Sequence, residues 1–478
     1  MKNDEIIEMF RTGNLNQQGL FRQLFSASAL LNVFEDKFKT SSGKGIDRIN
    51  GFQFQSRAED ELESASHRAC VGAYRFSPYL EVLKLKGRDK FPRIIGIPTI
   101  RDRVLLNQLN AFLSAIFPQQ VPKNVASTYV RRVAEETRSL DLEDSWVCST
   151  DIEKFYDSID RGRLLQQLTR YINHPAAIRL TERALLTPTL PKNTRRTARK
   201  SFSQITGVPQ GLSISNILAS IYMMDVDKAM KKFDQVRYLR YVDDVLMYGS
   251  HDKVLEAFKS LSRRLAIRRL KLHKLGSKKT QFASLDTEFG YLGYIFSGRS
   301  ITVRDSTIER FLHSIAARFS DFSHNKSRRL ERFNYLNEER LCEIFLEELN
   351  ERITGAISQN KRYGWIAYFS QINDLSLLHR LDHTISQFFN RLPEFSKSAP
   401  STLKKLGRAY WEMKFNPTGG YIRNYDEIST RAQRIEFLVR RGRIAPDERL
   451  TDEEINRRYE RYLHHVLSAM LEDEGAAY

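Results

Sequence analysis

The stretch RYLRYVDDVLMYGS, residues 237–250, places two adjacent aspartates, Asp243 and Asp244, inside a run that otherwise has the pattern of a buried strand. Burying carboxylates without partners is unfavourable, so these two side chains require an interaction partner. Apolar half-strands flank the pair, which predicts a hairpin with both carboxylates at its turn. A second apolar segment, SWVCST at 145–150, runs directly into Asp151. If that segment is a neighbouring strand, Asp151 joins the pair.

Three clustered carboxylates repel one another unless a cation lies among them. Carboxylate oxygens suit Mg²⁺, with Mn²⁺ as an alternative. Two such ions about 3.5–4 Å apart can activate an attacking oxygen and stabilise a leaving one, which is what nucleotidyl transfer needs. An aspartate pair alone is more often a turn or a solvated face, so the rest of the chain has to decide.

The composition favours a folded protein with a polyanionic partner. The chain has 478 residues, 41% of them hydrophobic and 11% aromatic, which is enough for two or three packed units. It carries 76 Lys and Arg against 58 Asp and Glu, a net charge of +18. Such an excess indicates nucleic acid or an acidic membrane surface rather than an ordinary basic protein.

The cysteines and the apolar segments indicate the cellular compartment in which the chain would work. Cys70, Cys148 and Cys342 lie far apart, with no zinc spacing and no disulfide framework, which favours a reducing, cytoplasmic setting. The N-terminal segment lacks the apolar core of a signal peptide. No run approaches the roughly 18 apolar residues of a membrane span, so we expect no membrane partner.

Periodicity predicts a mixed α/β first part and a helical last third. Residues 79–100 alternate apolar and basic residues around a charged tip, which predicts a hairpin. From about residue 305 to 395 the apolar spacing is helical. The segment 391–405, RLPEFSKSAPSTLKK, is the best linker candidate. The last 75 residues again read as helical, and no repeat or Walker-type phosphate loop is present.

Taken in order, several motifs resemble those of the reverse transcriptases, and within them a bacterial, retroelement-derived group associated with phage defence and abortive infection. The matching stretches run from about residue 43 to 300: GKGIDRINGFQF (43–54), YRFSPYLEVLKLK (74–86), PRIIGIPTIRDRV (92–104), STDIEKFYDSID (149–160), GVPQGLSISNILASIYM (207–223), YVDD (241–244), LKLHKLGSKKTQF (270–282) and YLGYIF (291–296). The defence-group likeness rests on a less specific stretch, residues 360–389.

The resemblance implies an α+β right-hand polymerase fold followed by an all-helical region. It assigns fingers and a palm with an antiparallel sheet to residues 1–300, a helical thumb to 301–395, and a helical C-terminal extension to 396–478. The thumb would pack against the product duplex. No Cys/His nuclease cluster, RNase H quartet or clear retron marker is visible in the sequence.

The resemblance also implies a metal set and an acid. Asp151, Asp243 and Asp244 would hold two Mg²⁺ ions, with Asp244 the weaker ligand. Lys279 would protonate the departing pyrophosphate as a general acid, and Lys278 is its near rival.

Further residues would contact the nucleotide and the nucleic acid. Tyr156 would be a steric gate against a ribose 2′-OH, although a packed aromatic is the plain alternative. Nucleotide contacts would come from Lys86, Arg93 and Gln210, with Lys84 or Lys90 as substitutes for Lys86. Template or primer contacts would come from Gly207, Pro209, Gly211, Tyr291, Leu292, Gly293, Arg195 and Arg196, the two arginines being otherwise part of a solvated charge run.

The sequence therefore predicts an RNA-templated DNA polymerase, acting in bacterial anti-phage defence with a dedicated noncoding RNA. Its partners would be an RNA template, dNTPs and a DNA product, and homo-oligomerisation is left open. A group II intron or other mobile-element enzyme is the first alternative. Template-independent or protein-primed synthesis, and a nucleic-acid-binding scaffold or toxin, are the others.

Overall fold

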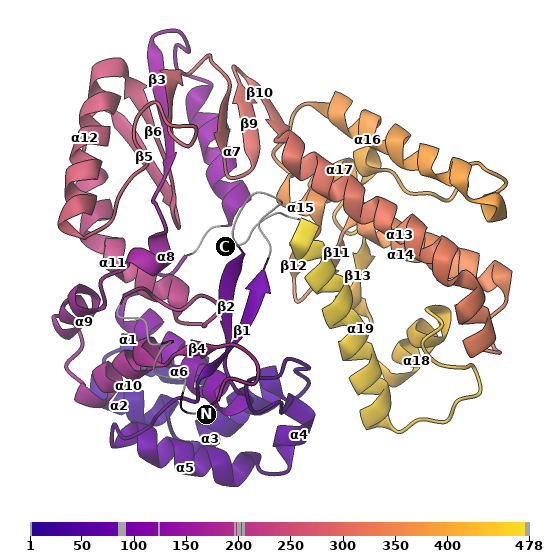
Figure 1. Ribbon diagram of the computed structural model, residues 1–478, viewed down its shortest axis with the longest axis horizontal. Coiled ribbons are helices and arrows are strands. Elements are labelled where there is room, and N and C mark those ends of the chain that lie inside the picture. Colours follow the sequence, from indigo (N-terminus) through magenta and orange to yellow (C-terminus); the bar gives the residue numbers. More distant parts are fainter. Residues whose placement is uncertain are drawn as a thin grey trace. The chain divides into compact units, whose positions relative to one another are not determined.

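The computed structural model describes residues 2–84, 92–122, 125–195, 197, 202 and 206–473, and the chain divides into two compact units. The first unit comprises Met1–Asn124 and Trp146–Ala283, and the second Val125–Ser145 and Ser284–Tyr478 (Figure 1). The predicted domain boundaries were residues 300 and 395. The observed division instead begins the main part of the second unit at Ser284 and adds the segment 125–145 to it. Within the described residues, no helix is long and apolar enough to cross a membrane.

A four-stranded sheet in the order β5-β6-β3-β7 is the centre of the first unit. Its strands are β3 (Ser145–Asp151), β5 (Val236–Tyr241), β6 (Asp244–Ser250) and β7 (Gln281–Ser284). Strands β5 and β6 are antiparallel and pair from Val236↔Gly249 to Tyr241↔Asp244, so they form the predicted hairpin. Four consecutive residues of β6 are buried, which explains why its sequence is continuously apolar instead of alternating.

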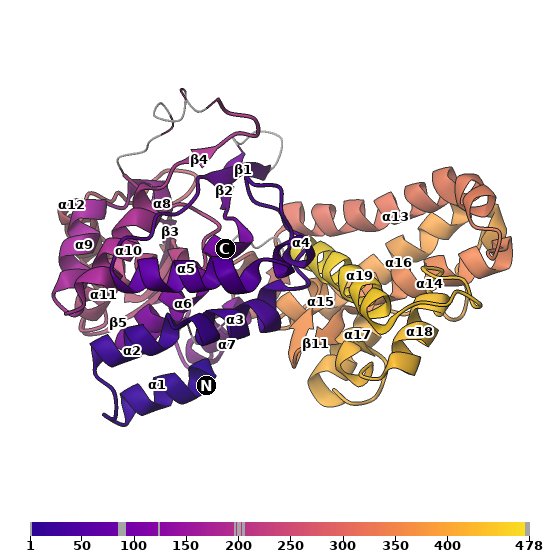
Figure 2. The ribbon, with the colours of Figure 1, turned by 90° about the horizontal axis from the view of Figure 1, so that it is seen from below.

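Helices surround this sheet and form most of the first unit. They are α1 (Asn3–Arg11), α2 (Gln17–Leu24), α3 (Ala27–Val33), α4 (Gly51–Gln55), α5 (Ala58–Cys70), α6 (Ile100–Ile116), α8 (Phe155–Ser158), α9 (Arg161–Thr169), α10 (Pro175–Leu186), α11 (Ser215–Met230) and α12 (His251–Ile267), with a π-helical turn at Phe34–Phe38. Helix α12 packs on β5 and β6, and α11 packs on α6, α9 and α12. Helices α3, α5 and α6 contact one another (Figure 2).

The predicted N-terminal hairpin is present as β1 (Tyr79–Lys84) and β2 (Arg93–Ile97). The two strands are antiparallel, with Leu80 opposite Ile97 and Lys84 opposite Arg93. Strand β4 (Thr189–Leu190) adds to β1 in parallel, which gives a three-stranded sheet β2-β1-β4.

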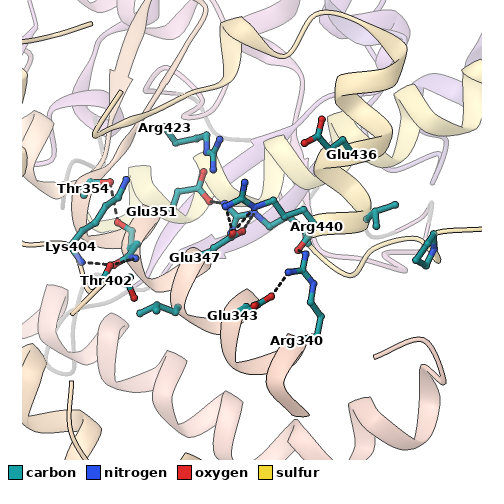
Figure 3. Close-up of a pocket in the computed structure, with 15 residues that line it drawn as sticks. Arg340, Glu343, Glu347, Glu351, Thr354, Thr402, Lys404, Arg423, Glu436 and Arg440 are labelled. Atoms are coloured by element: carbon teal, nitrogen blue, oxygen red, sulfur yellow. Dashed lines mark hydrogen bonds and ion pairs between the residues drawn. The ribbon is translucent and has the colours of Figure 1, made fainter. Parts of the chain in front are cut away.

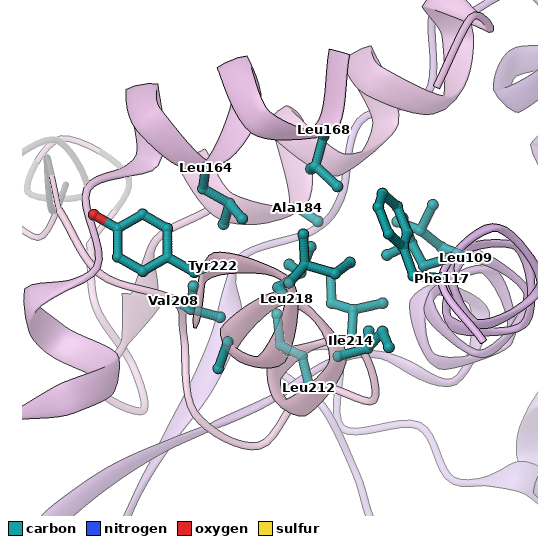
Figure 4. Packing of buried hydrophobic residues seen from close by; sticks show 14 of the residues in the cluster. Leu109, Phe117, Leu164, Leu168, Ala184, Val208, Leu212, Ile214, Leu218 and Tyr222 are labelled. Atoms are coloured by element: carbon teal, nitrogen blue, oxygen red, sulfur yellow. The ribbon is translucent and has the colours of Figure 1, made fainter. Parts of the chain in front are cut away.

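One hydrophobic core connects the helices of the first unit to the residues after Gly207 (Figure 4). Val208 and Leu212 are buried in it together with Leu218 of α11 and Leu164 of α9. Burying side chains of this size stabilises the fold by about 1.5–3 kcal/mol each. The loop that leads into α11 is therefore anchored on both sides by core residues.

The second unit is mainly helical. Its helices are α7 (Ala126–Thr137), α13 (Asp305–Arg332), α14 (Glu338–Thr354), α15 (Trp365–Tyr368), α16 (Leu375–Phe388), α17 (Leu406–Phe415), α18 (Arg431–Arg440) and α19 (Asp452–Asp473), with short 3₁₀ turns at Phe389–Arg391, Pro393–Phe395 and Tyr425–Glu427. Helix α13 packs on α14, α16 and α19.

Two small sheets accompany these helices. Strands β8 (Phe289–Tyr291), β9 (Tyr294–Ser297) and β10 (Ser300–Val303) form a meander, and β11 (Ala356–Ser358), β12 (Lys361–Tyr363) and β13 (Arg423–Asn424) form a second sheet in the order β12-β11-β13. The sequence pattern did not predict the second sheet, because strands of two or three residues are too short to show a period of two. The C-terminal region is thus helical, as predicted, but it is not purely so.

Candidate active site

The end of β3 and the β5–β6 turn bring two of the predicted aspartates together. Asp151 is the last residue of β3, and β3 is the sheet neighbour of β6. The backbone N–H of Ile152 donates to the carbonyl of Asp243 at 3.0 Å, so the residue after Asp151 is bonded directly to the turn. Asp243 lies in the turn itself, and Asp244 is the first residue of β6, opposite Tyr241.

The β5–β6 turn has a strained backbone. Val242 has φ 57°, a left-handed conformation that is an outlier for a β-branched residue. The Arg240 guanidinium donates to the Val242 carbonyl at 2.6 Å and also grips Asp227 of α11 through two hydrogen bonds of 2.8 and 2.5 Å. Hydrogen bonds of this kind hold a residue in an energetically unfavourable backbone conformation. Such strain concentrates at functional sites.

Basic side chains contact Asp151. Lys279 Nζ lies 2.8 Å from Asp151 Oδ2, and His273 Nε2 lies 3.4 Å from the same oxygen. The other ring nitrogen of His273 lies 3.3 Å from Glu153 Oε1, so this imidazole bridges two carboxylates. The sequence analysis missed His273, although it lies in the stretch that suggested Lys279.

The segment that carries Lys279 and His273 is fixed along the end of β3. The Glu153 N–H donates to the carbonyl of Lys271 at 2.8 Å. A buried hydroxyl pair, Thr150 and Thr280 at 2.8 Å, joins the neighbours of Asp151 and Lys279. These hydrogen bonds fix the backbone on either side of Lys279, whereas its ammonium group is half exposed.

The carboxylates fit a divalent ion that shares its ligands with a phosphorylated substrate. Among the described residues, no group of three or more His, Cys, Asp or Glu side chains is close enough to enclose a metal. Mg²⁺ rarely uses an all-protein cage: it keeps several waters and takes one or two carboxylates plus substrate phosphates. Asp151 at the end of β3 and Asp243 in the β5–β6 turn supply such a pair.

Tyr156 lies beside this pair. It belongs to α8, and its hydroxyl donates to Asn216 Oδ1 of α11 at 2.5 Å. Burial raises the pKa of the Tyr156 phenol, and the charge of Asp243 raises it further. The charges of Arg240 and Arg93 oppose this rise in the pKa of Tyr156. Phe155, by contrast, is buried in the core, as predicted.

The loop Gly207–Gly211 packs against both Tyr156 and β2. The Val208 N–H donates to the Tyr156 carbonyl at 2.8 Å, and the Gly96 N–H donates to the Gln210 carbonyl at 2.8 Å. A Cβ on Gly211, at φ +99°, would stand 2.6 Å from Ile95 Cγ2 and 2.8 Å from the Gly96 carbonyl oxygen. Position 211 therefore needs glycine, because strand β2 lies too close to leave room for a Cβ atom.

Side-chain bonds complete the anchoring of this loop. Gln210 Nε2 reaches Asp157 Oδ1 at 3.4 Å, and the Ser215 hydroxyl donates to the Pro209 carbonyl at 2.5 Å. Arg161, only 7% exposed, donates to the Gly207 carbonyl at 2.6 Å. Sequence reasoning missed Arg161, because an arginine in a polar helix start reads as a surface residue.

The hairpin β8–β9, predicted to contact the primer, belongs to the second unit. Its turn is Leu292 and Gly293, with φ 51° and 84°. Tyr291 and Leu292 are 2% and 4% exposed, and Tyr368 of α15 donates to the Leu292 carbonyl at 3.3 Å. Contacts from this turn to a ligand would therefore come from the backbone more than from these two side chains.

The remaining predicted residues are placed as follows. Arg93 starts β2 and is half-buried, opposite the exposed Lys84 of β1. Arg195 is exposed on an irregular segment. Lys86, Lys90 and Arg196 lie outside the described residues.

Comparisons with known proteins agree with this geometry. Residues 85–296 match the family described as "Reverse transcriptase (RNA-dependent DNA polymerase)". The "Putative COX1/OXI3 intron 1 protein" of Saccharomyces cerevisiae is 26% identical over 306 residues, which are 59% of this chain and 34% of that protein. The "Group II intron-encoded protein LtrA" of Lactococcus lactis subsp. cremoris is 24% identical over 219 residues, 43% of this chain and 34% of that protein. The chain thus spans about a third of the length of these relatives.

Two telomerase structures are also similar in part. Apo telomerase from Candida tropicalis, truncated from its C-terminal domain, gives a TM-score of 0.38 at 15% identity, over 48% of this chain and 56% of that one. Telomerase from Candida albicans with a fragment of telomeric RNA gives 0.39 at 11% identity, over 78% and 68%. The family match and the observed mixture of helices with an antiparallel hairpin at YVDD agree with the predicted fold class. Residues 85–296 match the reverse transcriptase family model, and the described residues form the predicted mixture of helices and antiparallel sheets, followed by a largely helical region.

Proposed function

We propose that this chain is an RNA-templated DNA polymerase that works by two-metal nucleotidyl transfer. The observation that carries the proposal is the hydrogen bond from Ile152 to Asp243, which joins two carboxylate-bearing strand ends inside a reverse transcriptase domain. Asp151 and Asp243 would hold Mg²⁺ or Mn²⁺, with Asp244 a weaker contributor. When bound, two ions about 3.5–4 Å apart would supply activation of the primer hydroxyl and stabilisation of the leaving phosphate.

Lys279 is the residue proposed to move a proton. Its ammonium group, 2.8 Å from Asp151 Oδ2, is at the site and half exposed, so a departing pyrophosphate could reach it. Protonating that leaving group would be general acid catalysis, with Lys278 as the rival donor.

Tyr156 is proposed as the sugar selector. Its ring lies near Asp243 and Arg93, and its hydroxyl is held by Asn216. A ring fixed in this position would clash with a ribose 2′-OH and so favour dNTPs. Arg93 and Gln210 would contact the incoming nucleotide, together with Lys86.

The nucleic-acid partners follow from charge and position. The net charge of +18 suits phosphate contacts, and we expect RNA affinity to fall steeply as salt rises. Gly207, Pro209, Gly211, Arg195 and Arg196 are the proposed template contacts, and the turn Tyr291–Gly293 the primer contact. The isolated free cysteines support a reducing, cytoplasmic compartment.

The biological setting has two candidates. The likeness of residues 360–389 to the defence group supports anti-phage activity with a dedicated noncoding RNA. The curated relatives are named as intron proteins, which supports a mobile-element role instead. Sequencing the RNA and DNA that copurify with the chain separates them: intron RNA with splice junctions supports the second role, and a short dedicated RNA with complementary DNA supports the first.

Primer extension on a defined RNA template tests the activity itself. The wild type should incorporate dNTPs in a template-dependent, chelator-sensitive way, and Asp151→Asn should not. Incorporation without template would indicate template-independent synthesis, and DNA attached to the polypeptide would indicate protein priming. If phage protection survived in the inactive variant, the fold would serve as a scaffold or toxin and catalysis would not be its function.

A further inference from the structure

A cavity of about 710 Å³ lies in the second unit (Figure 3). Its walls are α14, α18, the segment Thr402–Lys404 and β13. A volume of this size is in the range of small-molecule sites. None of the predicted site residues lines it, although Thr402 and Lys404 belong to the predicted linker 391–405.

Most charges around the cavity are paired. Arg340 is bound to Glu343, and Arg440 lies 2.5 Å from Glu347. The floor is a buried ion pair, in which Arg441 Nη2 lies 3.0 Å from Glu351 Oε2. These pairs neutralise one another and leave no net charge of their own.

Lys404 and Arg423 are left over. Neither has a carboxylate within ion-pair distance among the described residues, and Lys404 Nζ instead donates to the backbone carbonyl of Tyr421. Both cations line the same cavity. Burial lowers the pKa of Lys404 and the charge of Arg423 lowers it further, while the charge of Glu351 offsets part of this effect. Such a pair attracts an anion.

The backbone holds these two cations in place. Asn350 of α14 accepts from the Lys404 N–H at 2.7 Å and donates to the Thr402 carbonyl at 3.0 Å, so one side chain pins the segment. Arg423 is fixed by the pairing of β13 with β11, opposite Ala356. A site prepared in this way loses little entropy when a ligand binds.

A second observation points the same way. Arg441 is only 1% exposed, yet its Nη1 has no hydrogen-bond partner. A buried donor without a partner is unfavourable, and an acceptor that reached Arg441 Nη1 would satisfy it. Figure 3 shows Lys404 and Thr402 on one side of the cavity and Glu436 on the other, with Arg423 and Glu351 between them.

We propose that this cavity binds a phosphorylated small molecule of nucleotide size, with its phosphoryl group on Lys404 and Arg423. The apolar side chains of Leu346, Val439 and Pro446 would contact the body of the ligand. Arginine suits this task because its fork donates two hydrogen bonds to one phosphate. All of these residues belong to the second unit, whereas Asp151 and Asp243 belong to the first.

Calorimetric titration of the full chain without divalent ions tests the proposal, with inorganic pyrophosphate and adenosine monophosphate as probes. The wild type should bind at least one of them, and the double variant Lys404→Met/Arg423→Gln should bind at least tenfold more weakly. Lys405→Met, an exposed neighbour, is the matched control and should bind like the wild type. Asp243→Asn should also bind normally, which separates this site from the candidate active site.

Binding that the double variant leaves unchanged would overturn the proposal, as would no binding of either probe in the millimolar range. A short RNA that binds through Lys404 and Arg423 when neither probe does would also overturn it, in favour of a nucleic-acid contact. If the double variant unfolds, Arg423→Lys decides: it keeps the charge but loses the fork, and binding should weaken severalfold.

Discussion

Two hairpin turns in this molecule have nearly the same design. Tyr241 pairs with Asp244 across the β5–β6 turn, and Tyr291 pairs with Tyr294 across the β8–β9 turn. In each, two residues connect the strands and the first of them, Val242 or Leu292, has positive φ. Only the second residue differs in kind: the first turn has Asp243 where the second has Gly293.

The difference separates a turn built for chemistry from one built for packing. The β8–β9 turn has positive φ at both positions and follows the preference for glycine there, and its side chains are buried against α15. The β5–β6 turn instead combines a β-branched residue in the left-handed region with a carboxylate at its tip. A strained turn with a carboxylate at its tip is typical of a functional site.

Placing asparagine at the same position of both turns should have the largest effect. Asp243→Asn removes the charge that is proposed to bind a metal ion and keeps the side chain's shape, so template-dependent incorporation should fall by roughly 10²–10³-fold or more. Gly293→Asn should keep the incorporation rate of the folded protein within a few-fold of the wild-type rate, because Asn tolerates positive φ. Asp244→Asn should lie between them. Equal losses in the Asp243 and Gly293 variants would remove the distinction between the turns.

The tyrosines beside the two turns should differ as well. Tyr156→Ala opens the space next to Asp243, so the preference for dNTP over NTP should drop by about 10–100-fold, the scale of one steric contact. Tyr368→Phe removes the hydrogen bond to the Leu292 carbonyl and should leave this preference unchanged. The measurement is incorporation of matched dNTP and NTP on one template. Unchanged sugar selection in Tyr156→Ala would contradict the steric-gate assignment.

Gly293→Ala should affect stability and not chemistry. The new Cβ would stand 3.5 Å from Phe369, an ordinary contact, so the cost is the strain of alanine at φ +84°. We expect a loss of about 1 kcal/mol in the free energy of unfolding of the second unit. Urea unfolding measures the stability of the three proteins with glycine, asparagine or alanine at position 293. We expect the glycine protein to be the most stable and the alanine variant the least. An alanine variant as stable as the wild type would show that the turn does not need glycine.

Val242→Gly should give the smallest change in stability. Glycine relieves the strain at φ 57° but loses the packing of Val242 on the core of the first unit. The two terms oppose each other, so the net change should stay within about 1 kcal/mol, whereas Val242→Ala loses packing and keeps most of the strain. Incorporation should fall in Val242→Gly because the turn becomes more mobile. A glycine variant less stable than the alanine variant would show that the turn is not strained.

The sequence predicted the parts of the site that lie on regular elements. The apolar flanks of Asp243 predict β5 and β6, and the strand before Asp151 predicts β3, so the meeting of these residues follows from sheet pairing. Arg240, Arg161 and His273 escaped prediction, because each acts through a backbone or carboxylate partner brought close only by tertiary packing. The cavity at Lys404 escaped for the same reason: its walls come from four separate segments.

The central claim is that Asp151 and Asp243 together hold a divalent ion, and Mn²⁺ binding followed by electron paramagnetic resonance tests it most directly. The experiment needs no template, and uses the full chain, the Asp151→Asn/Asp243→Asn variant and, as control, Gly293→Asn. The account predicts that the wild type and the control change the Mn²⁺ spectrum beyond that of the Mn²⁺–dNTP complex alone, and that the double variant does not. Equal Mn²⁺ binding by the wild type and a folded double variant would contradict the claim.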